Sequence, residues 1–181
     1  ALLGLDVEVV EAVCAKVAQG EVVSAANMNA NGQIVIAGSS AAVERAMEEA
    51  KAQGAKRAVK LPVSAPFHCA LMKPAAEKLA ERLADIDITT PSLPVINNVD
   101  VSVCDDPALI REALVRQAYS PVRWIETIES LGEMGVEAVI ECGPGKILSG
   151  LTKRIVKTMQ GAAVTDADSM AQAIELAGGK V

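Results

Sequence analysis

Residues 21–38, EVVSAANMNANGQIVIAG, decide the fold of the first third of the chain. Two extended runs, 21–29 and 33–38, are rich in β-branched and small apolar residues, and the residues between them end in Asn31 and Gly32. An Asn-Gly pair supplies the positive φ angles that a tight β-hairpin requires. The stretch therefore predicts two neighbouring antiparallel strands.

The segments on either side of this hairpin complete a larger unit. Before it, ALLGL at 1–5 is a short apolar run, and 7–17 carries valines at helical spacing. After it, 41–53 has the pattern of an amphipathic helix, and 57–63 is a fourth extended run. The order β-α-β-β-α-β is typical of a ferredoxin-like module, so we expect residues 1–63 to form a ferredoxin-like small subdomain.

In the second part of the chain, strands alternate with helices. The amphipathic segment 73–86 predicts a helix with Leu79, Leu83 and Ile86 facing inward. Alternation of this kind predicts an α/β domain, over residues 64–181, with a mainly parallel sheet and helices on its faces. The other expected elements are strands at 93–101 and 136–143, helices at 107–119, 124–134 and 146–159, and a last short strand and helix within 162–177.

The composition excludes several classes of protein. Of the 181 residues, 51% are hydrophobic and 22% charged, which is enough apolar material for a folded core. The formal net charge is -6 and no basic stripe carries interleaved aromatic residues, so no nucleic-acid partner is expected. The apolar stretches are shorter than the roughly 20 residues that cross a bilayer, and no signal peptide opens the chain, so we expect a cytoplasmic protein with no membrane partner. The four cysteines are far apart and are expected to be reduced thiols.

His68 is the only histidine, in the segment LPVSAPFHCALM. It stands where a strand gives way to a turn, and imidazole is the side chain that most readily exchanges a proton near neutral pH. His68 is therefore a candidate general acid and base, the competing interpretation being an ordinary hydrogen-bonded histidine. Because no further ligand lies at a useful spacing, no metal site is predicted.

Other polar patterns have simple structural interpretations beside functional ones. Asn27 and Asn29 share one face of their strand and could line a pocket, although hairpins commonly carry Asn. Gln117 is most simply a surface residue of its helix. Residues 143–146, GPGK, lack the glycine spacing of a phosphate loop and predict a tight turn. A basic cluster could receive an acidic partner or form a solvated helix face: Lys153, Arg154 and Lys157.

An obvious nucleophile is missing from the sequence. No G-x-S-x-G elbow, the strained turn that exposes a catalytic serine, occurs in the chain. Cys69 lies beside His68, but neighbours in sequence rarely face each other productively. The residues alone thus offer a base without a nucleophile for it to activate.

Five blocks of the chain, in their order and spacing, closely resemble the malonyl-CoA:acyl-carrier-protein transacylases of bacterial fatty-acid synthesis. The resemblance extends over essentially every residue from Ala1 onward, and five blocks in register are more specific than any single motif. The blocks are SAANMNANGQIVIAG at 24–38, LPVSAPFHCALMKPA at 61–75, PVINNVD at 94–100, LVRQAYSPVRW at 114–124 and ECGPGKILSGLTKRI at 141–155.

The resemblance implies a hydrolase-like α/β acyltransferase domain with an inserted ferredoxin-like subdomain. It also implies a ping-pong reaction in which a serine takes malonyl from coenzyme A and the phosphopantetheine thiol of acyl carrier protein then takes it from the serine. His68 matches the histidine that activates the serine, and Gln117 matches the residue whose backbone carbonyl holds the other ring nitrogen. Phe67 resembles the pattern associated with malonyl, and Asn27 and Asn29 fall in the pocket-edge strand. Malonyl-CoA and acyl carrier protein are the implied partners, with no cofactor besides the coenzyme A substrate.

The same resemblance places the serine upstream of Ala1, with the arginine that binds the malonyl carboxylate and the segment that helps build the oxyanion hole. We therefore expect either a longer native chain or a separate polypeptide that carries these parts, and no transfer by the 181 residues alone. The alternative is a ferredoxin-like small-ligand-binding regulatory module without catalysis. It would concentrate ligand contacts in residues 1–63 and give His68 no role. An acidic carrier protein would dock on the nearest basic cluster, at Lys153, Arg154 and Lys157.

Overall fold

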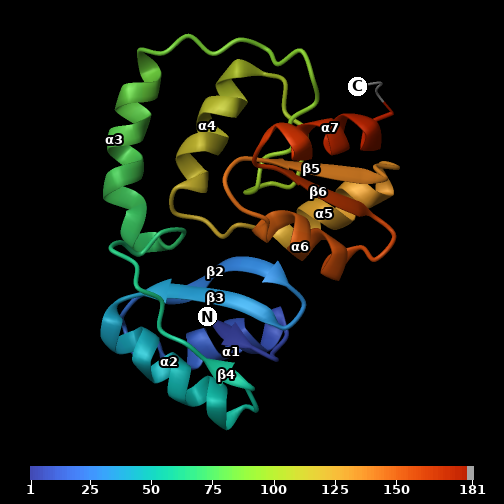
Figure 1. The fold of residues 1–181 in the computed structure, drawn as a ribbon. Coiled ribbons are helices and arrows are strands. Elements are labelled where there is room, and N and C mark those ends of the chain that lie inside the picture. Colours follow the sequence, from blue (N-terminus) through green and yellow to red (C-terminus); the bar gives the residue numbers. More distant parts are fainter. Residues whose placement is uncertain (179–181) are drawn as a thin grey trace. The chain divides into compact units, whose positions relative to one another are not determined.

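The computed structural model describes residues 1–178 and divides the chain into two compact units, Ala1–Trp124 and a second that begins at Ile125. Both units contain helices and strands (Figure 1), which confirms the predicted α/β class. Within the described residues, no helix is both long enough and apolar enough to span a lipid bilayer.

A four-stranded sheet opens the first unit. Its order is β2-β3-β1-β4, and every neighbouring pair is antiparallel. The hairpin predicted from the sequence joins β2 to β3, and of its Asn-Gly pair only Gly32 takes a positive φ, 72°. The fourth strand, Arg57–Ala58, is shorter than the predicted 57–63, and Val59 beyond it exchanges backbone hydrogen bonds with Ala1. The strands are β1 (Leu2–Leu3), β2 (Val23–Ala30), β3 (Gln33–Gly38) and β4 (Arg57–Ala58).

Two helices, α1 (Val7–Val17) and α2 (Ser40–Ala52), lie on the same side of β2 and β3 (Figure 1). Both agree with the helices that the sequence predicts. Leu2, Val10 and Ile34 are fully buried, at 0% exposure, so one side chain from each of β1, α1 and β3 meets in the core. Burial of such aliphatic side chains is the main stabilising term of this part of the chain.

Close approach of the backbones is built into this core. Helix α2 buries Ala42, Ala46 and Ala50, which recur every four residues on one face. At the end of β3, a Cβ atom on Gly38 would lie 2.1 Å from the carbonyl oxygen of Val22. Only glycine fits at that position.

After β4 the chain forms a 3-10 helix, η1 (Ala70–Met72), then α3 (Lys73–Ala84) and α4 (Pro107–Gln117), and α3 packs against α4. The helix predicted at 73–86 is confirmed, but its inward face is not. Leu83 is buried, whereas Leu79 and Ile86 are 36% and 39% exposed. A single neighbouring helix covers only a narrow stripe of α3, and Ala76 and Leu83 occupy that stripe.

The strand predicted at 93–101 is wrong. Apart from one isolated bridge, the described segment pairs with no strand. The Asn97 side-chain oxygen accepts a hydrogen bond from the N–H of Asp100 at 2.7 Å, and the Asn97 carbonyl accepts one from Val101 at 3.1 Å. Such local bonds compete with a sheet ladder, so residues 97–102 close into a loop, called the 97–102 loop below.

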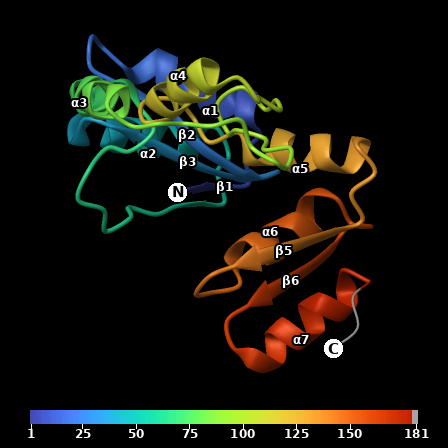
Figure 2. The same cartoon turned by 90° about the horizontal axis from the view of Figure 1, so that it is seen from above.

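The second unit contains the parallel part of the structure. Strands β5 and β6 pair in parallel, with Ile140 opposite Ala162, and lie side by side in both views (Figure 2). The two sheets therefore differ in kind: the four-stranded sheet is antiparallel, and the two-stranded sheet is parallel. Of the mainly parallel sheet that the sequence predicts, residues 1–178 contain only the pair β5 and β6. Helix α5 (Trp124–Glu133) begins at the last residue of the first unit, and β5 (Ala138–Cys142), α6 (Ile147–Ile155), β6 (Gln160–Val164) and α7 (Ala167–Leu176) follow it.

Candidate active site

His68 lies in the connection between β4 and η1 and is half-buried. Its φ of 61° falls in the left-handed region, which is costly for a residue with a side chain and often marks a functional position. The ring nitrogen Nδ1 is 3.0 Å from the backbone carbonyl oxygen of Gln117. A carbonyl can only accept, so Nδ1 carries the proton and Nε2 is left to exchange protons with other groups.

The sequence explains why the Gln117 carbonyl can accept this bond. Gln117 ends α4, and the last carbonyls of a helix have no donor within the helix. The next donor in helical register would be the amide of residue 121, but Pro121 has no N–H. Ala118 and Tyr119 donate their N–H groups to carbonyls earlier in α4. The Gln117 oxygen is therefore left to His68.

The segment after α4 returns to β2. The Val122 N–H donates to the Ala26 carbonyl at 2.8 Å, and the Val122 carbonyl accepts from the Met28 N–H at 3.0 Å. These bonds form a parallel bridge between Asn27 and Val122. The strand that carries Asn27 thus lies directly beside the segment that follows Gln117.

Of the five residues predicted to form the site, the structure joins two. His68 and Gln117 are in contact, whereas in residues 1–178 no hydrogen bond links the other three side chains to His68. Phe67 precedes His68 and is 52% exposed. Asn27 and Asn29 are half-buried at alternate positions of β2, with the buried Met28 between them.

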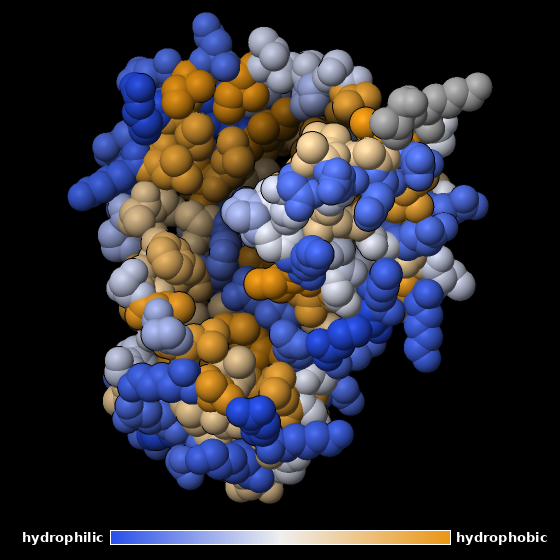
Figure 3. Space-filling model, in the orientation of Figure 1, coloured by the Kyte–Doolittle hydropathy of each residue, from blue (hydrophilic) through white to orange (hydrophobic). Residues whose placement is uncertain are grey.

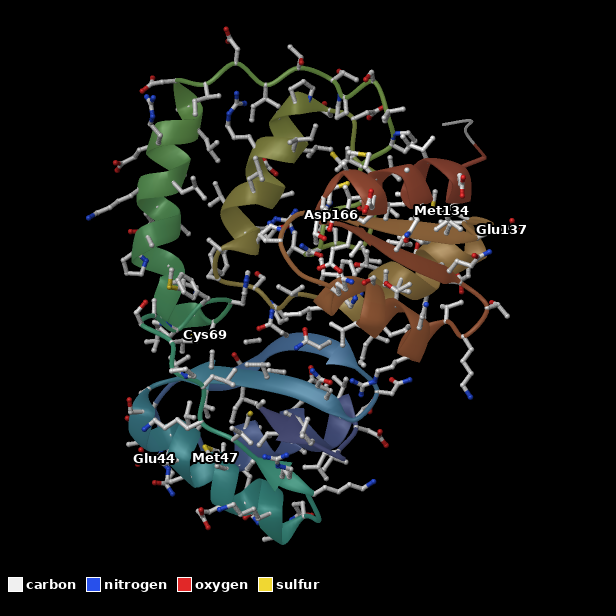
Figure 4. The ribbon with its side chains drawn as sticks, viewed as in Figure 1. Glu44, Met47, Cys69, Met134, Glu137 and Asp166 are labelled. Carbon is white, nitrogen blue, oxygen red and sulfur yellow. The ribbon has the colours of Figure 1, made fainter. Side chains whose placement is uncertain are left out.

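Cys69 is not suited to act as the nucleophile. Its side chain is 1% exposed, and Sγ donates to the Pro66 carbonyl at 3.2 Å, within the connection that leads from β4 to α3 (Figure 4). Burial raises the pKa of the Cys69 thiol, although a backbone hydrogen bond from Leu71 opposes the shift. Because the thiolate is the reactive form, a raised pKa makes this thiol a poor nucleophile.

The turn at residues 143–145 brings a carboxylate to the start of α6. A side-chain oxygen of Glu141 accepts the N–H of Ser149 at 2.9 Å. This bond, with further ones from Leu148 and Ile147, holds the pKa of Glu141 below its usual value. A helix N-terminus attracts anions, and here the chain's own carboxylate already meets its N–H groups. The N–H groups at the start of α6 are thus bound by Glu141 of the same chain. Glu141 was not identified from the sequence.

A second group that sequence reasoning missed is an ion pair beside Gln117. Arg116 binds Asp100 through Nη1 and Nη2, the two terminal nitrogens of its guanidinium, with Nη2 2.7 Å from Oδ2. The side-chain hydrogen bonds from Arg116 hold the pKa of Asp100 below its usual value. The spacing of Asn97 and Asp100 is typical of a turn and is the one local signal for this group. Nothing in the sequence near Arg116 indicates that it pairs with Asp100, 16 residues earlier.

The remaining candidates are on surfaces. Lys153 and Arg154 in the last turn of α6 and Lys157 beyond it are exposed. Within residues 1–178, no three His, Cys, Asp or Glu side chains are grouped to hold a metal ion.

An open cavity of about 780 Å³ follows α2, where Glu44 and Met47 point outward (Figure 4). It lies in the part of the chain where the regulatory alternative expects its ligand, and its lining mixes apolar side chains with three glutamates and one arginine. The lining residues are Val17, Glu44, Arg45, Met47, Glu48, Glu49 and Ala52.

Comparison with known proteins gives one family. The family model described as the acyl transferase domain matches residues 3–175. The chain is similar to the malonyl CoA-acyl carrier protein transacylase of Escherichia coli strain K12, with 53% identity over 176 residues. That match covers 97% of this chain and 57% of the relative, so the chain spans little more than half the length of such relatives.

Solved structures agree. The acyl carrier protein S-malonyltransferase from Vibrio cholerae matches with a TM-score of 0.94 and 57% identity, over 96% of this chain and 56% of that one. A structure of a type II PKS acyl-carrier protein in complex with its malonyl-transacylase matches with a TM-score of 0.94 and 54% identity, over 97% of this chain and 57% of that one.

Proposed function

This chain belongs to the acyl transferase domain family, and on that premise we propose that the whole protein transfers malonyl from coenzyme A to the phosphopantetheine thiol of acyl carrier protein. The names of the relatives and the complex with a carrier protein support these two partners. We assign the nucleophilic serine to the part of the relatives' length that these 181 residues do not span.

The proposed chemistry has two half-reactions that balance. In the first, Nε2 of His68 takes the serine hydroxyl proton while the oxygen attacks the thioester carbonyl; the C–S bond breaks and the proton passes to the coenzyme A sulfur. In the second, Nε2 takes the proton of the carrier thiol, the sulfur attacks the serine ester, and the C–O bond breaks. The proton then returns to the serine oxygen, and His68 ends as it began.

One observation supports this role most directly, the 3.0 Å contact between Nδ1 of His68 and the Gln117 carbonyl. An acceptor on Nδ1 fixes the tautomer and orients the ring, which is the arrangement that a histidine acting through Nε2 needs. An ordinary surface histidine needs neither a fixed tautomer nor a left-handed backbone.

The remaining assignments follow from the family. We propose Asn27, Asn29 and Phe67 as substrate-binding residues at the edge of the malonyl pocket. We propose that the carrier protein docks on the basic cluster of Lys153, Arg154 and Lys157 through its acidic surface. The strand order β2-β3-β1-β4 and the order of elements support residues 1–63 as a ferredoxin-like subdomain, with 64–181 as the later part of the large acyltransferase domain.

The test is malonyl transfer by the whole protein, with mass spectrometry of the carrier protein as the measurement. We expect His68→Ala to slow transfer by about 10²-fold or more, the loss typical of a general acid and base. Gln117→Ala is the matched control, because it keeps the backbone carbonyl and should transfer at close to the original rate. The 181-residue chain alone should not transfer malonyl. Undiminished transfer by His68→Ala would contradict the assignment of the base.

A further inference from the structure

An ion pair lies one residue from the carbonyl that accepts the His68 hydrogen bond. Arg116 directly precedes Gln117 at the end of α4 and binds Asp100 of the 97–102 loop through two parallel N–H···O bonds. A planar guanidinium held at its two terminal nitrogens is fixed in orientation as well as in distance. The pair therefore restrains rotation of the last turn of α4.

The same loop holds the chain on the far side of Gln117. The Arg123 N–H donates to the Asn98 carbonyl at 3.4 Å, and its Nη1 donates to the Val99 carbonyl at 3.3 Å. The 97–102 loop thus binds the chain both before and after the Gln117 carbonyl. The carbonyl that contacts His68 lies in a segment fixed at its two ends.

The loop itself is internally ordered. Asn97 accepts from the Asp100 N–H at 2.7 Å through its side-chain oxygen, and its Nδ2 donates to the Ser102 carbonyl at 3.3 Å. These bonds hold the backbone of Asp100 in place independently of the ion pair with Arg116. Because its loop is ordered, the Asp100 carboxylate can hold the Arg116 guanidinium in one position.

The ion pair is poorly placed to serve overall stability. The side chains of Arg116 and Asp100 are 41% and 34% exposed, and pairs in such surroundings contribute little to folding. Its direct structural effect is local, on the end of α4. That effect reaches the acceptor of His68 through a single peptide unit.

We propose that Asp100 is a positioning residue that holds Arg116, and with it the Gln117 carbonyl, in line with Nδ1 of His68. The inference rests on the proposed function, which gives a fixed imidazole its purpose. Asp100 touches no reacting atom and acts through Arg116 and the backbone.

The tautomer of His68 tests the proposal without an activity assay. His68 is the only histidine of these 181 residues, and in the whole ¹⁵N-labelled protein its imidazole signals are identified as those that His68→Ala removes. NMR then gives its tautomer ratio, measured at a pH where the ring is neutral. In the unmodified protein we expect the Nδ1–H form to dominate. Asp100→Asn should lower the ratio of Nδ1–H to Nε2–H by about two- to fivefold, as expected for loss of a partly exposed ion pair. Arg116→Lys, which keeps the charge and loses the paired bonds, should give an intermediate ratio.

Glu44→Gln is the matched control, because it removes an exposed ion pair, Lys60 with Glu44 at 2.9 Å, elsewhere in the same unit. It should leave the ratio unchanged. Asp100→Glu keeps the carboxylate and should restore most of the original ratio. Should Asp100→Asn fail to fold, Arg116→Lys tests the loss of the paired bonds in its place. An unchanged ratio in Asp100→Asn, or an equal shift in Glu44→Gln, would refute the proposal. Failure of malonyl transfer by the whole protein would refute the proposed function and leave this result in force.

Discussion

In residues 1–58, Leu2 and Ile34 have no exposed surface, whereas in residues 59–123 the side chains of Val63 and Leu93 are 65% and 73% exposed. Apolar side chains gather on the visible face over α3 and α4 (Figure 3). The first region is organised by burial of aliphatic side chains between a sheet and two helices. The second is organised largely by hydrogen bonds that fasten loops and helix ends.

Those hydrogen bonds connect the ends of α3 and α4 to each other and to the loops beside them. Arg111 donates to the carbonyls of Leu83 and Ile86 at the end of α3, and Asp106 accepts the first N–H groups of α4. With the pair of Arg116 and Asp100, they fix the two helices and the loop around the His68 acceptor. The comparison shows that the buried aliphatic core of the first unit and the hydrogen bonds that fix the acceptor of His68 lie in separate stretches of the chain.

The largest effect should come from the core of the first region. Ile34→Ala removes a fully buried side chain and should lower the free energy of unfolding by about 2–5 kcal/mol. Leu93→Ala removes an equally apolar but 73% exposed side chain and should change it by less than about 0.5 kcal/mol. Urea unfolding followed by circular dichroism measures both. Equal losses in the two variants would abolish the distinction between the regions.

A smaller effect should appear at His68, where the second region places a residue in a left-handed conformation. Glycine has no Cβ to strain there, so His68→Gly should be more stable than His68→Ala by about 1 kcal/mol. Urea unfolding of the two variants gives the difference. If His68→Ala were the more stable, the left-handed backbone at this site would carry no strain.

The smallest effect should be a dependence on acid. Arg116 holds the pKa of Asp100 below its ordinary value, 3.8. The stabilisation from Asp100 is therefore fully present above that ordinary value and is lost as pH falls through the lower pKa of the folded protein. Arg123 and Asn97 act in the same direction. Asp100→Asn should show a flatter loss of stability below about pH 4 than the unmodified protein, measured by urea midpoints across pH. Superimposable acid curves would show that the pair does not couple to folding.

The sequence predicted the first region best, because its signals are local. The Asn-Gly turn and the valine spacing of α1 each act within a few residues, and their outcome needs no distant partner. In the second region the same reasoning failed where contacts between distant residues determine the structure. An apolar run at 93–101 suggested a strand, but the bonds of Asn97 with Asp100 fold it into a loop.

The candidate site was only partly readable. His68 was singled out from its type and place alone, whereas Gln117 looked like a surface residue until the family resemblance gave it a role. Its contribution is a backbone oxygen, and side-chain chemistry cannot reveal which carbonyl remains without a donor. Asp100 and Arg116 lie 16 residues apart and meet only once α4 and the loop have formed.

Pro121 has a consequence for any survey of substitutions in this protein. Every other amino acid at position 121 restores an amide N–H that competes for the Gln117 oxygen, whereas no exchange at position 117 removes that oxygen. Tolerance would therefore be broad at 117 and narrow at 121. In a saturation library, the sensitive position would therefore be 121, although the oxygen that contacts His68 belongs to residue 117.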